Sequence, residues 1–204
     1  IAVAGILLLI IAFFAVKLVM RIGSSPKKQT VVEEQVKEES KGDTKEDSAE
    51  IQTEAKTTDN LTKDAPEVLD LITRYYNSRA SKDYDTLKSL CEKFDDATRE
   101  EIESQDSAIE SYSNIMTYSK AGLTEGSYVV YVYFDAKLKG ISTPAPSLRE
   151  LYLITNAENS LIISDKEASA EQKNFTEQMR ADADVQALVT DVNKKLADAE
   201  AADE

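Results

Sequence analysis

The side chains best placed to do chemistry in this chain are acids and tyrosines on segments with strand-like patterns. Two carboxylates and three hydroxyls make up the set: Asp135, Glu150, Tyr131, Tyr133 and Tyr152. A carboxylate beside a tyrosine in an apolar cavity can act as a general base opposite an oxyanion donor. Asp135, however, shares a strand face with Lys137, and we expect that face to point away from the core. A surface ion pair or exposed strand positions therefore explain Asp135 better than catalysis does.

The residue inventory excludes most other catalytic chemistry. The 204 residues include no His, no Trp and one Cys, Cys91. Without His the chain has no Ser-His-Asp triad, no Cys-His pair and no His-containing zinc site. One Cys cannot form an internal disulfide or a thiolate cluster. The sequence matches no phosphate loop, EF-hand or nucleophile elbow, so we expect no catalytic, cofactor-binding or metal site.

The net charge bears on the class of partner. The chain carries 24 Lys and Arg against 38 Asp and Glu, a formal charge of −14. Nucleic acids and anionic lipid surfaces are bound by basic faces. We therefore expect no nucleic-acid partner.

Residues 1–22 have the composition of a transmembrane helix. Ile1–Val16 include no charged or polar side chain, and twenty helical residues rise about 30 Å, which matches a hydrocarbon core. A secretory signal peptide is the alternative, but its apolar core spans only about 7–15 residues. Arg21–Ser25 is also a poor cleavage site. The pattern predicts a retained single-pass anchor in a lipid bilayer.

The orientation of this anchor is open to two readings. Lys17, Arg21, Lys27 and Lys28 flank its C-terminal end, and the positive-inside tendency alone would hold that end in the cytoplasm. We expect the chain to begin inside its anchor, so residues before Ile1 also bear on orientation. A long acidic tether with an isolated module suits a surface protein. We therefore expect an extracytoplasmic C-terminal portion.

Residues 23–63 have the composition of a disordered acidic linker. The segment has no aromatic residue and few large aliphatics, and Glu, Lys, Ser, Thr and Asp dominate it. Such a segment cannot bury enough apolar surface to offset its ordering entropy. Forty flexible residues reach about 35 Å, so the linker would let a folded module stand clear of the bilayer.

Helical patterns begin at Asp64. Asp64 as N-cap, followed by Pro66 and Glu67, predicts a helix start. A stripe with a period of 3.6 residues follows and ends where Asn77–Lys82 breaks it; its members are Val68, Leu69, Ile72, Tyr75 and Tyr76. Two further helices are expected, at Asp83–Cys91 and at about Asp96–Ser111.

The period changes to two after Tyr112. We expect strands at Ile115–Lys120, Ser127–Lys139, Arg149–Thr155 and Leu161–Ser164. In the second strand the even positions are expected to face the core and the odd positions to face away. Two prolines within residues 140–147 remove ladder donors, so this segment is expected to be a loop. Short links between sequential strands favour an antiparallel meander.

Residues 166–204 return to helical patterns. One apolar stripe consists of Val185, Leu188, Val189, Val192 and Leu196, and Phe175 and Met179 mark a helix before it. We expect these helices to pack against the preceding module. The alternative is a partner-binding or self-associating helix pair.

Tyrosine is the commonest aromatic residue, with nine Tyr against five Phe. Five of the nine could converge on one side of the sheet as a ligand or partner surface: Tyr112, Tyr118, Tyr131, Tyr133 and Tyr152. Tyr combines a large apolar contact area with a polar tip, which suits pockets and interfaces. The alternative is that strands favour Tyr and that its hydroxyl tolerates half-burial.

Several short segments carry a family resemblance: Tyr75–Ser78, Lys82–Leu87, Gly126–Tyr133, Thr143–Pro146 and Leu151–Tyr152. With the order of elements, they resemble the nuclear-transport-factor-2-like (cystatin-like) superfamily in membrane-anchored bacterial proteins. The resemblance covers about Ala65–Asp165 and implies a long first helix across a bent sheet. Members include isomerases, dehydratases, accessory domains of cell-wall enzymes and bitopic assembly subunits of type IV secretion machines. Enzymes of the superfamily commonly use a His-Asp or Tyr-Asp constellation, and this chain has no His to match.

These patterns predict an α+β protein in four parts. They are a transmembrane helix over residues 1–22, a linker over 23–63, the α+β domain over 64–165 and a helical segment over 166–204. The expected function is a non-catalytic binding or assembly module of the bacterial cell envelope that captures a protein or a small apolar ligand. The alternatives are a His-free enzyme with a Tyr-carboxylate pocket and an assembly subunit of a secretion or conjugation machine.

Overall fold

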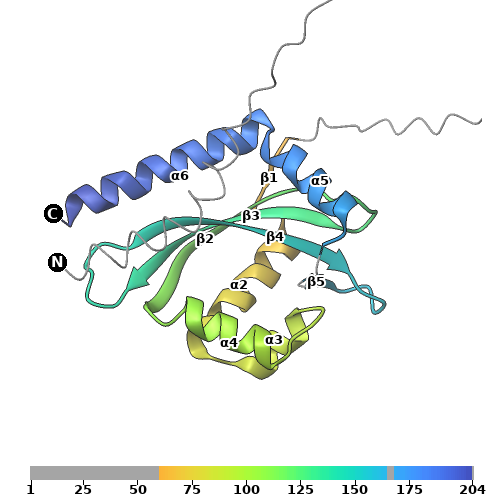
Figure 1. Ribbon diagram of the computed structural model, residues 1–204, viewed down its shortest axis with the longest axis horizontal. Helices are drawn as coiled ribbons and strands as arrows, with labels where there is room; N and C mark the ends of the chain where they lie inside the picture. Colours follow the sequence, from red (N-terminus) through yellow and green to blue (C-terminus); the bar gives the residue numbers. More distant parts are fainter. Residues whose placement is uncertain (1–59, 165–167, 204) are drawn as a thin grey trace, which may run out of the picture. The chain divides into compact units, whose positions relative to one another are not determined.

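The computed structural model describes residues 60–164 and 168–203. The expected anchor and nearly all of the expected linker lie outside the described residues. The described part is an α+β fold with a five-stranded antiparallel sheet in the order β1-β2-β3-β4-β5 (Figure 1). The strands are β1 (Thr62–Lys63), β2 (Ile109–Ala121), β3 (Tyr128–Leu138), β4 (Ala145–Thr155) and β5 (Leu161–Ile163). No helix within these residues is both long enough and apolar enough to cross a bilayer.

Three helices cover one face of the sheet: α2 (Pro66–Ser81), α3 (Tyr84–Leu90) and α4 (Asp96–Gln105) (Figure 1). The main hydrophobic core lies between them and the sheet and holds fourteen buried side chains of the described residues. Its fully buried members include Ile72, Tyr76, Leu87, Val130, Val132 and Leu153. The even positions of β3 therefore face this core, as expected.

Two further helices, α5 (Ala170–Arg180) and α6 (Ala183–Ala202), lie on the opposite face of the sheet (Figure 1). The expected packing of the C-terminal helices against the module is confirmed. The odd positions of β3 face away from the main core, as expected, but the expectation that they are exposed is wrong, because Val129, Tyr131 and Tyr133 are buried on this side. A central strand with a layer on each face is apolar at nearly every position, and β3 has this composition.

The start and end of α2 differ from expectation. Asp64 is not the N-cap, because Ala65 holds that position. The Asp64 backbone has φ +50°, its N–H donates to the carbonyl of Thr117 at 2.8 Å, and its carboxylate accepts from the N–H of Thr117 at 2.8 Å. Asp64 therefore ties β1 to β2. At the other end, α2 continues through the expected break and stops at Lys82, which has φ +57°.

Three strand boundaries also differ. β1 lies within the expected linker and pairs with β2 through Thr62 and Lys63. β2 begins at Ile109 rather than Ile115, so the preceding helix ends at Gln105. β4 begins within the expected loop and includes Pro146, which pairs with Asp135 of β3. Proline is tolerated there because β5 pairs with the far end of β4, at Leu153–Thr155, and leaves this edge open.

A β-bulge in β2 changes which side chains share a face. Ser113 pairs with Asp135 and Met116 with Tyr133, so three steps along β2 match two steps along β3. Asn114, inside the bulge, has φ +51°. Because side chains alternate along a strand, one extra residue reverses the faces on its two sides.

Candidate functional site

Four of the five candidate tyrosines share a face of the sheet. Tyr118, Tyr131, Tyr133 and Tyr152 lie on the side of α5 and α6, and we call these four the tyrosine face. Tyr112 lies on the opposite side, where its ring packs edge-on against Tyr76 and Phe134. The bulge in β2 separates Tyr112 from Tyr118.

The tyrosine face is covered by the chain's own C-terminal helices. Tyr131 forms a buried cluster with Val129, Met179 and Val185. Tyr118 and Tyr152 are half-buried and pack against the same cluster. The tyrosines therefore lie in an internal interface between the sheet and the helix pair α5–α6.

A charged contact fixes one end of this interface. Lys120 Nζ lies 2.6 Å from Asp182 Oδ2 and 2.9 Å from Asp184 Oδ1. Asp184 also accepts the N–H of Leu61 at 2.9 Å. We call the contact between Lys120, Asp182 and Asp184 the clasp. Its lysine is 6 % exposed, whereas the two carboxylates are 28 % and 30 % exposed.

Lys120 and Asp184 each favour the charged form of the other. Burial raises the pKa of Asp184, but hydrogen bonds from Lys120 and from the N–H of Leu61 outweigh it, and the pKa is lowered overall. Burial lowers the pKa of Lys120, but the hydrogen bonds that it donates to the two carboxylates outweigh this effect, and the pKa is raised overall. Lys120 and Asp184 are therefore both charged at neutral pH.

Two more contacts join the helices to the sheet. Arg180 donates two hydrogen bonds of 2.7 Å to the carboxylate of Glu150. The ammonium of Lys195 lies 5.0 Å from the ring centre of Tyr133, a cation–π distance. Glu150, a candidate general base in the sequence, thus has an arginine partner.

The hydroxyl of Tyr131 is the unsatisfied group of this interface. The side chain is 3 % exposed, and none of the described residues gives its hydroxyl a hydrogen-bond partner. Burial, with a contribution from Glu150, raises the pKa of Tyr131, so the phenol stays protonated. A buried hydroxyl without a partner costs about 1–3 kcal/mol.

The other candidate acid, Asp135, lies beside a tyrosine hydroxyl. Tyr133 donates to Asp135 Oδ1 at 2.6 Å, and Asn114 donates to Oδ2 at 2.6 Å. Lys137 donates to the backbone carbonyls of Ile141 and Ser142. Asp135 is half-buried and accepts both hydrogen bonds. The bond from Asn114 joins the bulge of β2 to β3.

A second polar cluster lies at the end of α2, and the sequence reasoning missed it. Arg79, whose side chain is 1 % exposed, makes two hydrogen bonds to Asp106, of 2.8 and 2.5 Å. Tyr112 donates to the same carboxylate at 2.6 Å. Arg79 follows Tyr75 by four residues and Tyr76 by three, so it lies on the same apolar face of the helix. A charged residue on that face was the signal in the sequence that could have indicated a buried ion pair.

This cluster supplies hydrogen-bond donors rather than a base. Burial raises the pKa of both Tyr112 and Tyr76, so both phenols stay protonated. The pKa of Arg79 is raised, because the bond to Asp106 outweighs burial, and the guanidinium stays charged. Three donors meet on the carboxylate of Asp106 and hold α2 to the junction of α4 and β2.

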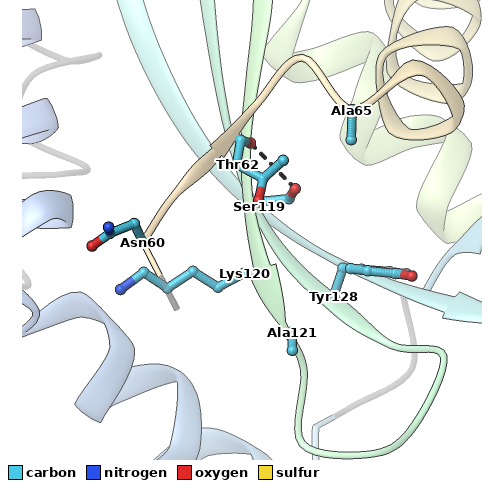
Figure 2. A pocket seen from close by; sticks show the side chains of 7 residues that line it. All are labelled: Asn60, Thr62, Ala65, Ser119, Lys120, Ala121 and Tyr128. Carbon is cyan, nitrogen blue, oxygen red and sulfur yellow. Dashed lines mark hydrogen bonds between the residues drawn. The ribbon is translucent and has the colours of Figure 1, made fainter. Parts of the chain in front are cut away.

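A shallow depression of about 340 Å³ lies at the β1–β2 edge of the sheet. Its lining residues are Asn60, Thr62, Ala65, Ser119, Lys120, Ala121 and Tyr128. Figure 2 shows Asn60 and Lys120 on one side of this edge and Ala65 and Tyr128 on the other. Ser119 Oγ donates to the carbonyl of Thr62 at 3.4 Å, and the amine of Lys120 is held in the clasp. Within residues 60–164 and 168–203 no group of three acids and cysteines is close enough to hold a metal ion.

Comparison of the chain with protein-family models, curated proteins and solved structures finds no match. The tyrosine face and the Arg79 cluster are therefore the features of the described residues that bear on function.

Proposed function

We propose that this chain is a membrane-anchored, non-catalytic binding or assembly module of the bacterial cell envelope. The apolar composition of residues 1–22 supports the anchor, and the polar composition of residues 23–63 supports a flexible linker. The module, a nuclear-transport-factor-2-like domain over residues 64–165, stands on the extracytoplasmic side. Its partner is a protein or a small apolar ligand.

The observation that carries this proposal is that the tyrosine face buries amphipathic helices. Aromatic rings lie at its centre, and charged side chains, Lys120 and Glu150, lie at its margins. An apolar, aromatic centre with a polar rim is the usual anatomy of a protein-binding surface. This surface recognises a helix with apolar side chains on one face and matching charges at its ends.

A His-free enzyme is the second candidate, and the Arg79 cluster supports it. Asp106 and Tyr112 bring a carboxylate and a phenol within 2.6 Å inside the α2 side of the fold. This candidate ranks second because both oxygens of the Asp106 carboxylate accept hydrogen bonds from Arg79. A carboxylate bound in this way is a poor general base. The third candidate, an assembly subunit of a secretion or conjugation machine, shares the layout of an anchor followed by a domain.

Photo-crosslinking in cells tests the proposal. A photoreactive phenylalanine analogue at Tyr118 of the full chain is expected to label a protein partner in the membrane fraction. The same analogue at Lys88, exposed on the other side of the sheet, is the matched control. Labelling that is equal at both positions contradicts the binding surface. A turnover activity lost in both Asp106→Asn and Tyr112→Phe favours the enzyme instead.

A separate measurement tests the anchor and its orientation. The full chain is expected to stay in the membrane pellet after an alkaline carbonate wash, and a chain without residues 1–22 to leave it. Protease added to intact spheroplasts is expected to digest the module. Release of the full chain by the wash, or protection from protease, contradicts the proposed location.

A further inference from the structure

The helix pair α5–α6 is attached to the sheet more weakly than the helices on the other face. Of the described residues, four buried side chains form its cluster, against fourteen on the α2 side. Its polar attachments are the clasp, which joins a buried lysine to carboxylates that are 28 % and 30 % exposed, and the Arg180–Glu150 pair, whose arginine is 52 % exposed and which contributes little. An element with few buried contacts opens at a lower free energy than the whole domain.

The docked state also has an internal cost. The Tyr131 hydroxyl is buried under this layer without a partner among the described residues. Undocking of α5–α6 would return this hydroxyl to water and recover its hydration. The apolar gain of docking is therefore small, and the polar penalty at Tyr131 offsets part of it, so the interface opens at a low free energy.

The contacts that dock α5–α6 are specific in charge as well as in shape. Lys120 receives two carboxylates from the start of α6, Glu150 receives Arg180 from the end of α5, and Tyr133 receives Lys195. Every copy of the chain carries both halves of this pattern. The helix pair of a second copy therefore fits the tyrosine face as well as its own pair does.

We propose that α5–α6 exchanges between copies, so that the helix pair of one copy docks on the tyrosine face of another. This inference rests on the proposed function, because anchoring in one membrane raises the effective concentration of each copy for the other. Reciprocal exchange gives a closed dimer with two identical interfaces, and each interface reuses contacts that already exist in one chain.

Single-cysteine chains test the exchange without disturbing the clasp. Thr143 Oγ1 donates to Asp203 Oδ1 at 2.9 Å between the β3–β4 connection and the end of α6, and both side chains are solvent-accessible. Two differently tagged full chains, Thr143→Cys and Asp203→Cys, each also carrying Cys91→Ser, are reconstituted together in lipid vesicles. A short thiol cross-linker is expected to join them into a heterodimer.

Two control samples are needed to interpret the heterodimer yield. A single chain with both Thr143→Cys and Asp203→Cys reports the closed form through an internal cross-link. A mixture of Lys88→Cys and Asp203→Cys chains measures random collision, because Lys88 lies on α3, on the other side of the sheet. The exchange predicts a heterodimer yield well above this control.

Removing the carboxylates of the clasp is expected to change the rate of exchange. Exchange requires undocking, and Asp182→Asn with Asp184→Asn leaves the buried Lys120 without a carboxylate. The double change is therefore expected to speed heterodimer formation at least about fivefold, with little change in the final yield. The matched control is Asp198→Asn, the same change on an outward-facing ion pair of the same helix with Lys194. This control is expected to leave the rate unchanged.

Three outcomes overturn the exchange. One is an internal cross-link in the double-cysteine chain with no heterodimer above the collision control. Another is no cross-link in either sample, which would mean that α6 does not dock as described. The third is labelling of a different protein, and not of a second copy, by the photoreactive analogue at Tyr118 in cells, which would give the tyrosine face another occupant. None of these outcomes removes the membrane anchor or the labelling at Tyr118, which test the proposed function separately.

Discussion

The two faces of the sheet are held by different kinds of interface. On the α2 side the layers meet through a large apolar core and an ion pair in which Arg79 is 1 % and Asp106 is 11 % exposed. On the α5–α6 side they meet through a small apolar cluster and an ion pair in which Arg180 is 52 % and Glu150 is 20 % exposed. Both interfaces contain an arginine-carboxylate pair with two hydrogen bonds. The pairs differ in their surroundings rather than in their chemistry.

This difference shows which interface the fold depends on. A buried charge must keep its partner, because an uncompensated charge in the interior costs several kcal/mol. An exposed pair can open into water at small cost. The α2 side therefore holds the fold together, and the α5–α6 side is an interface that can open while the rest stays folded.

The largest expected effect on stability comes from removing the buried carboxylate of Asp106. Asp106→Ala leaves the Arg79 guanidinium without its partner and is expected to lower the free energy of unfolding by about 3–5 kcal/mol. Glu103→Ala, on the same helix, is the matched control, because its pair with Arg99 is exposed. The control is expected to cost less than about 1 kcal/mol. Urea unfolding of both variants measures the difference, and equal losses would mean that the Arg79 pair is not buried.

The next prediction compares the loss of stability when either of two leucines on β4 is replaced by alanine. Leu153 and Leu148 lie on opposite faces of β4, the first fully buried in the main core and the second packed against the α5–α6 cluster. Leu153→Ala is expected to cost about 2–5 kcal/mol and Leu148→Ala clearly less, measured by the same urea titration. A larger loss at Leu148 would reverse the ranking of the two faces.

A smaller effect is expected from emptying the second cluster. Met179→Ala removes a buried side chain of α5, and undocking of the helix pair limits its cost to about 1–2 kcal/mol in global stability. Faster hydrogen exchange is expected in α5 and α6, with the amides of α2 unchanged. An equal rise in the exchange rate of α2 would mean that the two faces unfold together.

The smallest effect comes from the clasp, and it depends on pH. Asp184→Asn is expected to cost about 1 kcal/mol or less at pH 7. Because the folded-state pKa of Asp184 is lowered, its contribution is present above its unfolded value of about 3.9 and is lost as the pH falls through the folded value. Because the pKa of Lys120 is raised, its contribution is lost only as the pH rises above about 10.4.

Amide exchange of α6 at several pH values measures this dependence. The parent chain is expected to lose protection of α6 below pH 4, and Asp184→Asn to show a weaker change there. A parent chain whose α6 exchange keeps one opening free energy from pH 7 to pH 3 would contradict the role of the clasp.

Local patterns in the sequence predicted most of the elements. The apolar stripe from Val68 to Tyr76 indicated the first helix, and alternation indicated β3 and the even face of the main core. The same strand carried a signal that was not used: its unbroken run of apolar and aromatic residues is typical of burial on both faces. The burial of Tyr131 and Tyr133 follows from that run.

Other features depend on contacts between distant segments and have no local signal. The bulge that separates Tyr112 from Tyr118 is a mismatch in length between two strands, which one strand alone does not show. The two-residue β1 forms because Asp64 meets Thr117, which lies 53 residues further along the chain. Arg79 lay on a recognisable stripe, but its partner Asp106 lies beyond two intervening helices.

Native-state hydrogen exchange of the full chain in low concentrations of urea tests the central claim most directly. The amides of Val185 and Val192 in α6 are expected to exchange through an opening of lower free energy and weaker urea dependence than those of Ile72 and Tyr76 in α2. One shared opening free energy and one shared urea dependence for all four amides would contradict a separately opening helix pair.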